Sequence, residues 1–234
     1  MRNSKLIGLL FAGASALFGG EADGSIYKVF QQTNNTGYSL TKDTHINSNQ
    51  ANLHQFNARN FSAKGSNPRL EGLIRFEGIF GDGEEQIPYG SKIESSMLTF
   101  NLTEAGQTGT NVHRMVQYWP ESVTWNQMGG DGINPNGIEA SVKITDSFNS
   151  NVLGGIELNV TDDLTLWSQG VPNYGWALIP NNLSDISYDI ASSEYDDISL
   201  RPKLEINYFL PVPEPATLSL IGIGVGALGF RRKR

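Results

Sequence analysis

The chain has 234 residues, a formal net charge of −7 at pH 7 and no cysteine. Without cysteine there is no disulfide framework, so the stability of the fold must come from packing and from sheet hydrogen bonds. The acidic balance argues against nucleic acid and anionic membrane surfaces as partners, because both carry negative charge.

The N-terminus has the layout of a secretory signal peptide. Two basic residues precede an uncharged stretch that ends in small residues at Gly20 and Ala22, and such residues are typical of a cleavage site. The run Ala14-Ser15-Ala16 offers an earlier site. We expect residues 1–22 to be removed during export, so that the mature chain begins near Asp23.

The C-terminus carries a second targeting signal. Pro213-Glu214-Pro215 precede an uncharged stretch, residues 216–230, and four consecutive cations at 231–234 end the chain. This stretch spans only about 22 Å as a helix, less than the hydrocarbon core of about 30 Å, so we expect a short transmembrane anchor. The cations favour the cytoplasmic side of the membrane, which leaves the preceding domain outside.

Pro-Glu-Pro, one apolar helix and a basic end together resemble the PEP-CTERM sorting tail of Gram-negative bacteria that make exopolysaccharide. The resemblance implies recognition by a membrane-embedded exosortase, removal of the tail and release or attachment at the cell surface. The sorting motif is then Pro213, Glu214 and Pro215 within a tail of residues 212–234, and the chain contacts the membrane only through this tail before processing. An ordinary C-terminal membrane anchor is the alternative.

Residues 23–211 remain between the two signals, and we expect them to form a single domain. A segment of this size buries one substantial core without needing a structural metal. It contains 11 basic and 22 acidic residues, a net charge of −11. Anionic polymers are therefore disfavoured as partners unless a cation bridges them.

Short alternating segments, broken by Gly, Asn, Pro and Ser, run through this domain and indicate an all-β fold. We expect strands at residues 26–31, 43–47, 53–61, 69–77, 93–102, 110–117, 138–145, 156–160, 174–179 and 203–208. The strand at 69–77 should have one solvated face, because charged and apolar residues alternate along it. The only expected helix is 161–169, capped by Thr161 or Asp162 and ended by Gly170.

A series of short motifs follows the same order as one known family. They are Thr41-Lys42-Asp43-Thr44-His45-Ile46, Leu73-Ile74-Arg75-Phe76-Glu77, Trp119-Pro120-Glu121-Ser122-Val123-Thr124-Trp125-Asn126, Val160-Thr161 with Trp167, Asn173-Tyr174-Gly175, Ser192-Ser193-Glu194 and Arg201-Pro202-Lys203-Leu204. Together they resemble the disaggregatase-related (DNRLRE) domain, also classed as a carbohydrate-binding module. One departure is Ala51-Asn52-Leu53, where the family has an Asn-Tyr-Gly turn, so no ligand role is assigned to this loop.

The resemblance implies a jelly-roll-like β-sandwich of two antiparallel sheets. It also implies an exported, surface-sorted module that binds carbohydrate without catalysis and is associated with extracellular polysaccharide. A purely structural spacer of the cell envelope or matrix is the alternative.

Catalytic signatures are missing from the sequence. It has no cysteine nucleophile, no Gly-x-Ser-x-Gly elbow, no His-Glu-x-x-His and no phosphate loop. Neighbouring carboxylates such as Asp162 and Asp163 point apart in an extended chain and do not flank one glycosidic bond as a pair. We therefore expect no enzyme activity, and a polysaccharide lyase or hydrolase that pairs distant acids is the third alternative.

Aromatic side chains are the expected glycan contacts, because sugars present apolar C–H faces that stack on Trp and Tyr. The candidates are Tyr174 and Trp176, which alternate onto one face of an expected strand, with Tyr188 and Tyr195 in the polar segment that follows. In the alternative interpretation, Tyr174 and Trp176 belong to the core face of their strand.

Calcium is a candidate cofactor. Asp131, Asn134 and Asn136 lie in an oxygen-rich loop, and hard cations prefer carboxylate and carbonyl oxygens. The alternative is a solvated Asn/Gly turn.

Other prominent residues have structural interpretations. We expect Trp119, Trp125 and Trp167 to plug one end of the sandwich. Arg75 should pair with a carboxylate rather than with a ligand. Glu121 should hold backbone N–H groups of its own turn, with a catalytic acid as the alternative.

Overall fold

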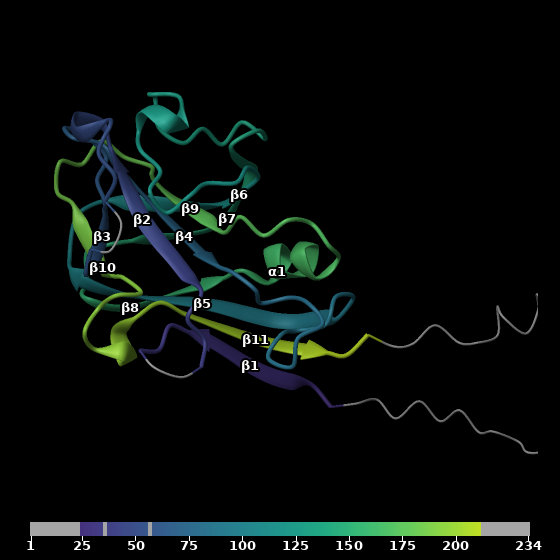
Figure 1. The fold of residues 1–234 in the computed structure, drawn as a ribbon. Helices are drawn as coiled ribbons and strands as arrows, with labels where there is room; N and C mark the ends of the chain where they lie inside the picture. Colours follow the sequence, from purple (N-terminus) through teal and green to yellow (C-terminus); the bar gives the residue numbers. More distant parts are fainter. Residues whose placement is uncertain (1–23, 35–36, 56–57, 212–234) are drawn as a thin grey trace, which may run out of the picture.

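Two antiparallel sheets face each other in the computed structural model, which describes residues 24–34, 37–55 and 58–211 (Figure 1). The expected signal peptide, the sorting residues Pro213, Glu214 and Pro215, and the expected transmembrane anchor lie outside the described residues. Within the described part of the chain, no helix has the length and apolar character needed to cross a membrane.

The first sheet is organised around a long central strand, β5. Its strands are β1 (Ile26–Gln31), β11 (Lys203–Phe209), β5 (Lys92–Glu104), β10 (Tyr188–Ala191), β3 (Asn60–Ala63) and β8 (Gly154–Asn159). Leu98 of β5 pairs with Leu204 on one side and with Leu158 on the other. Because β5 has thirteen residues, β11 and then β10 pair along one of its edges while β8 pairs along the other.

The second sheet has the order β2-β4-β9-β6-β7. Its strands are β2 (Thr41–Asn47), β4 (Leu70–Phe76), β9 (Trp176–Pro180), β6 (Gly109–Met115) and β7 (Ala140–Asn149). The chain passes from one sheet to the other at most connections, so each sheet contains strands from distant parts of the sequence. This confirms the expected jelly-roll-like β-sandwich.

One α-helix, α1 (Thr161–Ser168), lies between the sheets at one end of the sandwich (Figure 1). The expected side-chain cap is wrong: Val160 is the N-cap, and Thr161 Oγ1 instead accepts a hydrogen bond from Ser96 N of β5 (2.9 Å). Gly170 follows the helix with a φ of +92°, as expected for a helix end. Single-turn 3-10 helices are η1 (Ser48–Gln50), η2 (Asn126–Met128) and η3 (Ile198–Leu200).

The main core fills the space between the sheets. The alternation along β5 places Ser96, Leu98, Phe100 and Leu102 on the buried face, as predicted. Trp167 of α1 packs against Trp176 of β9, with ring centroids 4.8 Å apart. Trp167 therefore belongs to the sandwich core, as expected.

A second core lies on the outer face of the second sheet. Residues 116–139, which connect β6 to β7 and are here called the cover segment, pack over this face (Figure 1). Trp119 and Trp125 are buried in this outer core rather than at an end of the sandwich, which corrects the expected position. The prediction that β4 has a solvated face is also wrong. All seven residues of β4 are buried, because the cover segment shields the outer face of this strand.

The remaining differences concern short elements. The expected strand at 53–61 is restricted to its last residues, which begin β3, and Leu53 is exposed. The four-residue strand β10 was not predicted, because its sequence, Tyr-Asp-Ile-Ala, is too short to show a period. Its pairing with β3 and β5 places it in the sheet.

Trp125→Ala should lower the free energy of unfolding by about 3–5 kcal/mol, because it empties a buried aromatic site. The substitution also removes the hydrogen bond from the indole Nε1 to Gly130 O (2.8 Å). Urea unfolding measures the loss, with Leu183→Ala as the control, since Leu183 is 81% exposed. A loss below about 1 kcal/mol would contradict the burial of Trp125 under the cover segment.

Candidate functional site

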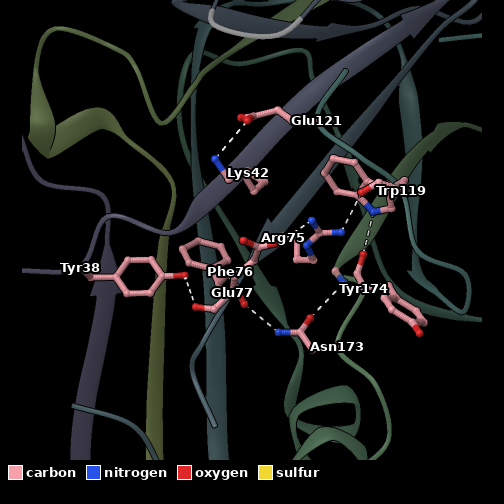
Figure 2. A network of polar contacts seen from close by, with 10 residues as sticks. Tyr38, Lys42, Arg75, Phe76, Glu77, Trp119, Glu121, Asn173 and Tyr174 are labelled. Carbon is pink, nitrogen blue, oxygen red and sulfur yellow. Dashed lines mark hydrogen bonds and ion pairs between the residues drawn. The ribbon is translucent and has the colours of Figure 1, made fainter. Parts of the chain in front are cut away.

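A buried arginine on β4 is the centre of a network of polar contacts (Figure 2). Arg75 Nη1 donates to Trp119 O (2.9 Å), and Nη2 pairs with Glu77 Oε1 (2.6 Å). The guanidinium carbon lies 4.7 Å from the ring centre of Trp119 and 4.9 Å from that of Tyr118. Glu77 is thus the carboxylate partner expected for Arg75, and the cation also holds two aromatic rings of the cover segment.

The turn before β9 completes the network. Trp119 Nε1 donates to Tyr174 O (2.7 Å), and Asn173 Oδ1 accepts from Gly175 N (3.0 Å). Gly175 has a φ of +71°, and a Cβ at this position would lie 2.0 Å from Ile74 O of β4. Only glycine allows the turn to lie this close to β4, so the turn places Tyr174 beside the cover segment.

One aromatic ring of this network is exposed. Tyr118 is 62% exposed and meets Tyr174 edge to face, with ring centroids 6.3 Å apart. Glu77, which pairs with Arg75, and an ion pair between Lys42 Nζ and Glu121 Oε2 (3.1 Å) also surround Arg75, because Lys42 is its cross-strand partner on β2. We call these five residues, Tyr118, Tyr174, Glu77, Lys42 and Glu121, the Tyr118 surface.

The Tyr118 surface combines the two kinds of contact that sugars use. The ring of Tyr118 stacks on the buried Arg75 guanidinium, and this contact restrains the orientation of the ring. The Tyr118 side chain is otherwise exposed to solvent. An aromatic surface stacks on the apolar face of a sugar ring, and nearby ammonium and carboxylate groups donate to and accept from hydroxyl groups. The chemistry of this surface suits binding of an uncharged, hydroxyl-rich ligand.

Glu121 has a different partner from the one expected. It pairs with Lys42 of β2. The backbone N–H groups of the cover segment are instead held by Glu71 of β4, whose Oε2 accepts from Ile133 N (2.6 Å). Both carboxylates therefore attach the cover segment to the sheet.

Two of the residues predicted to bind glycan lie in the core. Trp176 and Tyr188 have no exposed area, which corrects the outward interpretation and supports the inward alternative for Trp176. Trp176 Nε1 donates to Asp163 Oδ2 (2.8 Å), and Tyr188 OH lies 2.9 Å from Thr110 Oγ1. A side chain enclosed in this way has no face left for stacking on a sugar.

The other two predicted residues lie apart from each other. Tyr174 is half-buried and belongs to the Tyr118 surface. Figure 2 shows its side chain directed away from Arg75 while its carbonyl oxygen accepts from Trp119. Tyr195 lies in the loop after β10, where the Arg59 guanidinium is 5.1 Å from its ring centre. Of the four candidates, only Tyr174 contacts the exposed aromatic side chain of this network, Tyr118.

The proposed calcium loop forms a hydrogen-bonded turn. Asn136 Oδ1 accepts from Ile138 N (2.8 Å) and Glu139 N (3.0 Å), and Asn134 Nδ2 donates to Gly132 O (3.4 Å). Asp131 is exposed in the same loop. Among the described residues, no three His, Cys, Asp or Glu side chains gather in a group suited to a metal ion. These contacts support the solvated-turn alternative for Asp131, Asn134 and Asn136.

Tyr118 was missed by the sequence interpretation. Tyr118 directly precedes Trp119, the first residue of the motif. This pair of adjacent aromatic residues is the only local signal in the sequence that one of the two faces outward. In an extended chain neighbouring side chains point to opposite sides, so a buried Trp119 implies an outward Tyr118. That inference needs the burial of Trp119, which the sequence does not provide.

The C-terminus matches a known sorting signal. The family of the PEP-CTERM protein-sorting motif matches residues 211–234, which confirms the resemblance based on Pro213-Glu214-Pro215. No curated protein matches the chain. The motif indicates an exported protein that an exosortase recognises and that is anchored in the membrane during transit to the surface. The resemblance to the disaggregatase-related domain stays a prediction.

Two titratable groups on β2, the buried Asp43 and the half-buried His45, have opposite effects on the pH dependence of stability. Burial, together with the nearby Glu194 carboxylate, raises the pKa of Asp43 to about 7, although Asp43 Oδ2 accepts from Ser193 N (2.8 Å). Burial lowers the pKa of His45 to about 4. Asp43 keeps its proton in the folded domain over a range where the unfolded chain has lost it, so its contribution to stability falls as pH rises toward 7. His45 stays neutral where the unfolded chain is protonated, so its contribution falls as pH decreases.

Asp43→Asn should become more stable relative to the wild type as pH rises from about 4 to about 7, because the amide mimics the protonated acid and cannot ionise. Linkage limits the change in the difference between the two free energies of unfolding to about 1.4 kcal/mol per pH unit. Urea unfolding of both proteins at several pH values measures it, and the contribution of His45 cancels in the comparison. A difference that does not change with pH would show that Asp43 titrates normally in the folded domain.

Proposed function

We propose that this exported domain is a non-catalytic carbohydrate-binding module that contacts extracellular polysaccharide through the Tyr118 surface. The observation that carries the proposal is an exposed tyrosine ring held from beneath by a buried arginine. An aromatic ring fixed in this way loses little conformational freedom when it stacks on a sugar, so more of the contact energy is available for binding.

The charge of the domain limits the class of glycan that it can bind. A net charge of −11 on residues 23–211 disfavours anionic polysaccharide, and two of the five residues of the Tyr118 surface are carboxylates. An uncharged glycan avoids this repulsion. We infer that neutral sugar units are the ligand, with the exopolysaccharide or matrix of a Gram-negative bacterium as the setting.

Tyr118→Ala should weaken glycan binding at least about tenfold, since a tenfold loss corresponds to about 1.4 kcal/mol, the size of one aromatic contact. The melting temperature should stay close to that of the wild type, because Tyr118 is exposed. The ligand is first identified on a glycan array with the mature protein, and affinity is then measured by calorimetry. Tyr27→Ala is the matched control, since Tyr27 is a similarly exposed tyrosine (56%) on β1 of the other sheet.

Each outcome of this comparison has a clear meaning. Equal losses in Tyr118→Ala and Tyr27→Ala, or no loss in either, would rule out the Tyr118 surface as the binding site. A mature protein that binds no glycan on the array would favour the structural spacer. Cleavage of an array glycan would favour a lyase or hydrolase.

The sorting tail makes a separate prediction about the mature ends of the protein. Mass spectrometry of the protein from the surface of its host should find an N-terminus near Asp23 and a C-terminus near Pro213–Pro215. Glu214→Ala should leave the tail attached and the protein in the inner membrane, because it alters the matched motif. Recovery of surface protein that still ends at Arg234 would contradict removal of the tail.

A further inference from the structure

A polar cleft lies where the open edges of the two sheets meet α1. Its volume is about 530 Å³, and its walls come from β5, β6, β7, β8 and α1. It shares no residue with the Tyr118 surface. This volume is within the range of small-molecule sites in proteins, roughly 300–1,000 Å³.

An arginine with free donors lines this cleft. Arg114 Nε pairs with Asp163 Oδ1 (3.3 Å), and the Arg114 side chain is 16% exposed. Asp163 is itself held by two further donors, since its Oδ2 accepts from Thr145 Oγ1 (2.7 Å) and Trp176 Nε1 (2.8 Å). Neither terminal nitrogen of Arg114 has a hydrogen-bond partner among the residues that the structure describes.

The ion pair with Asp163 keeps the guanidinium of Arg114 at the wall of the cleft, because two hydrogen bonds hold this carboxylate in place. The terminal nitrogens remain available to a ligand. A guanidinium presents these donors as a rigid fork that reaches two adjacent acceptors at once. Two neighbouring hydroxyl oxygens of a sugar, or the two oxygens of a carboxylate, match this spacing.

The other charges of the cleft decide between these ligands. Lys143 Nζ pairs with Asp162 Oδ2 (2.6 Å) at the rim, and Asp146 Oδ2 accepts from Asn159 N (2.8 Å) on the wall. Four carboxylates line the cleft, those of Glu94, Asp146, Asp162 and Asp163, against the two cations Arg114 and Lys143. The excess of negative charge disfavours an anionic ligand, whereas hydroxyl groups both accept from the arginine and donate to the carboxylates.

We propose that this cleft is a second ligand site, which binds an uncharged sugar unit through adjacent hydroxyl groups on Arg114. The site does not depend on the Tyr118 surface, so either can be correct without the other. Serine and threonine hydroxyls on the walls complete the hydrogen bonds of the sugar, and Leu166 of α1 offers an apolar contact for its C–H face.

The test is calorimetric titration of the mature protein with neutral sugars, namely glucose, galactose, mannose, xylose and N-acetylglucosamine, and with glucuronate as the anionic comparison. At least one neutral sugar should bind more tightly than glucuronate. Arg114→Gln should weaken that binding at least about tenfold, because it removes the charged hydrogen bonds.

Because Arg114→Gln also removes a partner of Asp163, a second variant tests the cleft without touching that pair. Ser141→Met should fill the cleft from β7 and weaken sugar binding by a similar factor while the melting temperature is retained. Arg59→Gln is the control, since Arg59 is an exposed arginine paired with Asp196 outside the cleft. Tyr118→Ala should leave this binding unchanged, which separates the cleft from the Tyr118 surface.

Three results would overturn the proposal. They are the absence of binding by every neutral sugar tested, tighter binding of glucuronate than of any neutral sugar, and wild-type affinity in both Arg114→Gln and Ser141→Met. Whether the Tyr118 surface binds polysaccharide is decided separately, by the glycan array and the comparison of Tyr118→Ala with Tyr27→Ala.

Discussion

Two charged side chains on the outer face of β4, Glu71 and Arg75, are buried, and burial of a charge is tolerated only where hydrogen bonds and opposite charges meet it. Glu71 accepts from Ile133 N near one end of the cover segment, and Arg75 donates to Trp119 O near the other. The two charges therefore hold the cover segment against the second sheet at both ends. Without the cover segment, Glu71 and Arg75 would be exposed beside the apolar outer face of the second sheet.

The candidate binding surfaces follow from such buried pairs. Arg75 supports the ring of Tyr118 from beneath, so the residue that stabilises the cover segment also orients the exposed aromatic side chain. In the polar cleft, Asp163 has the corresponding role, because it binds the Trp176 indole of the core on one side and Arg114 on the other. In both places a charged side chain that is paired inside the fold, Arg75 or Asp163, positions a side chain of the candidate binding surface, Tyr118 or Arg114.

Local pattern accounts for the elements that were predicted well. β5 and β11 have alternating sequences with one apolar face, and their positions, like that of β1, agree with the prediction to within one or two residues. The pattern is less informative where both faces of a strand are covered. The charged residues of β4 suggested a solvated face, yet they lie under the cover segment, because burial depends on a connection that begins forty residues later in the chain.

By itself the sequence determined the C-terminal sorting signal, the absence of disulfides and the all-β class, since each depends on composition or on residues close together in the chain. Only the tertiary structure decided which aromatic residues face solvent. Trp176 and Tyr188 were candidates for sugar contact and are enclosed between the sheets, whereas Tyr118 is exposed although its neighbour Trp119 is buried. The physical reason is that exposure is set by packing between segments distant in the sequence, and an aromatic side chain has the same local pattern whether it faces the core or the solvent.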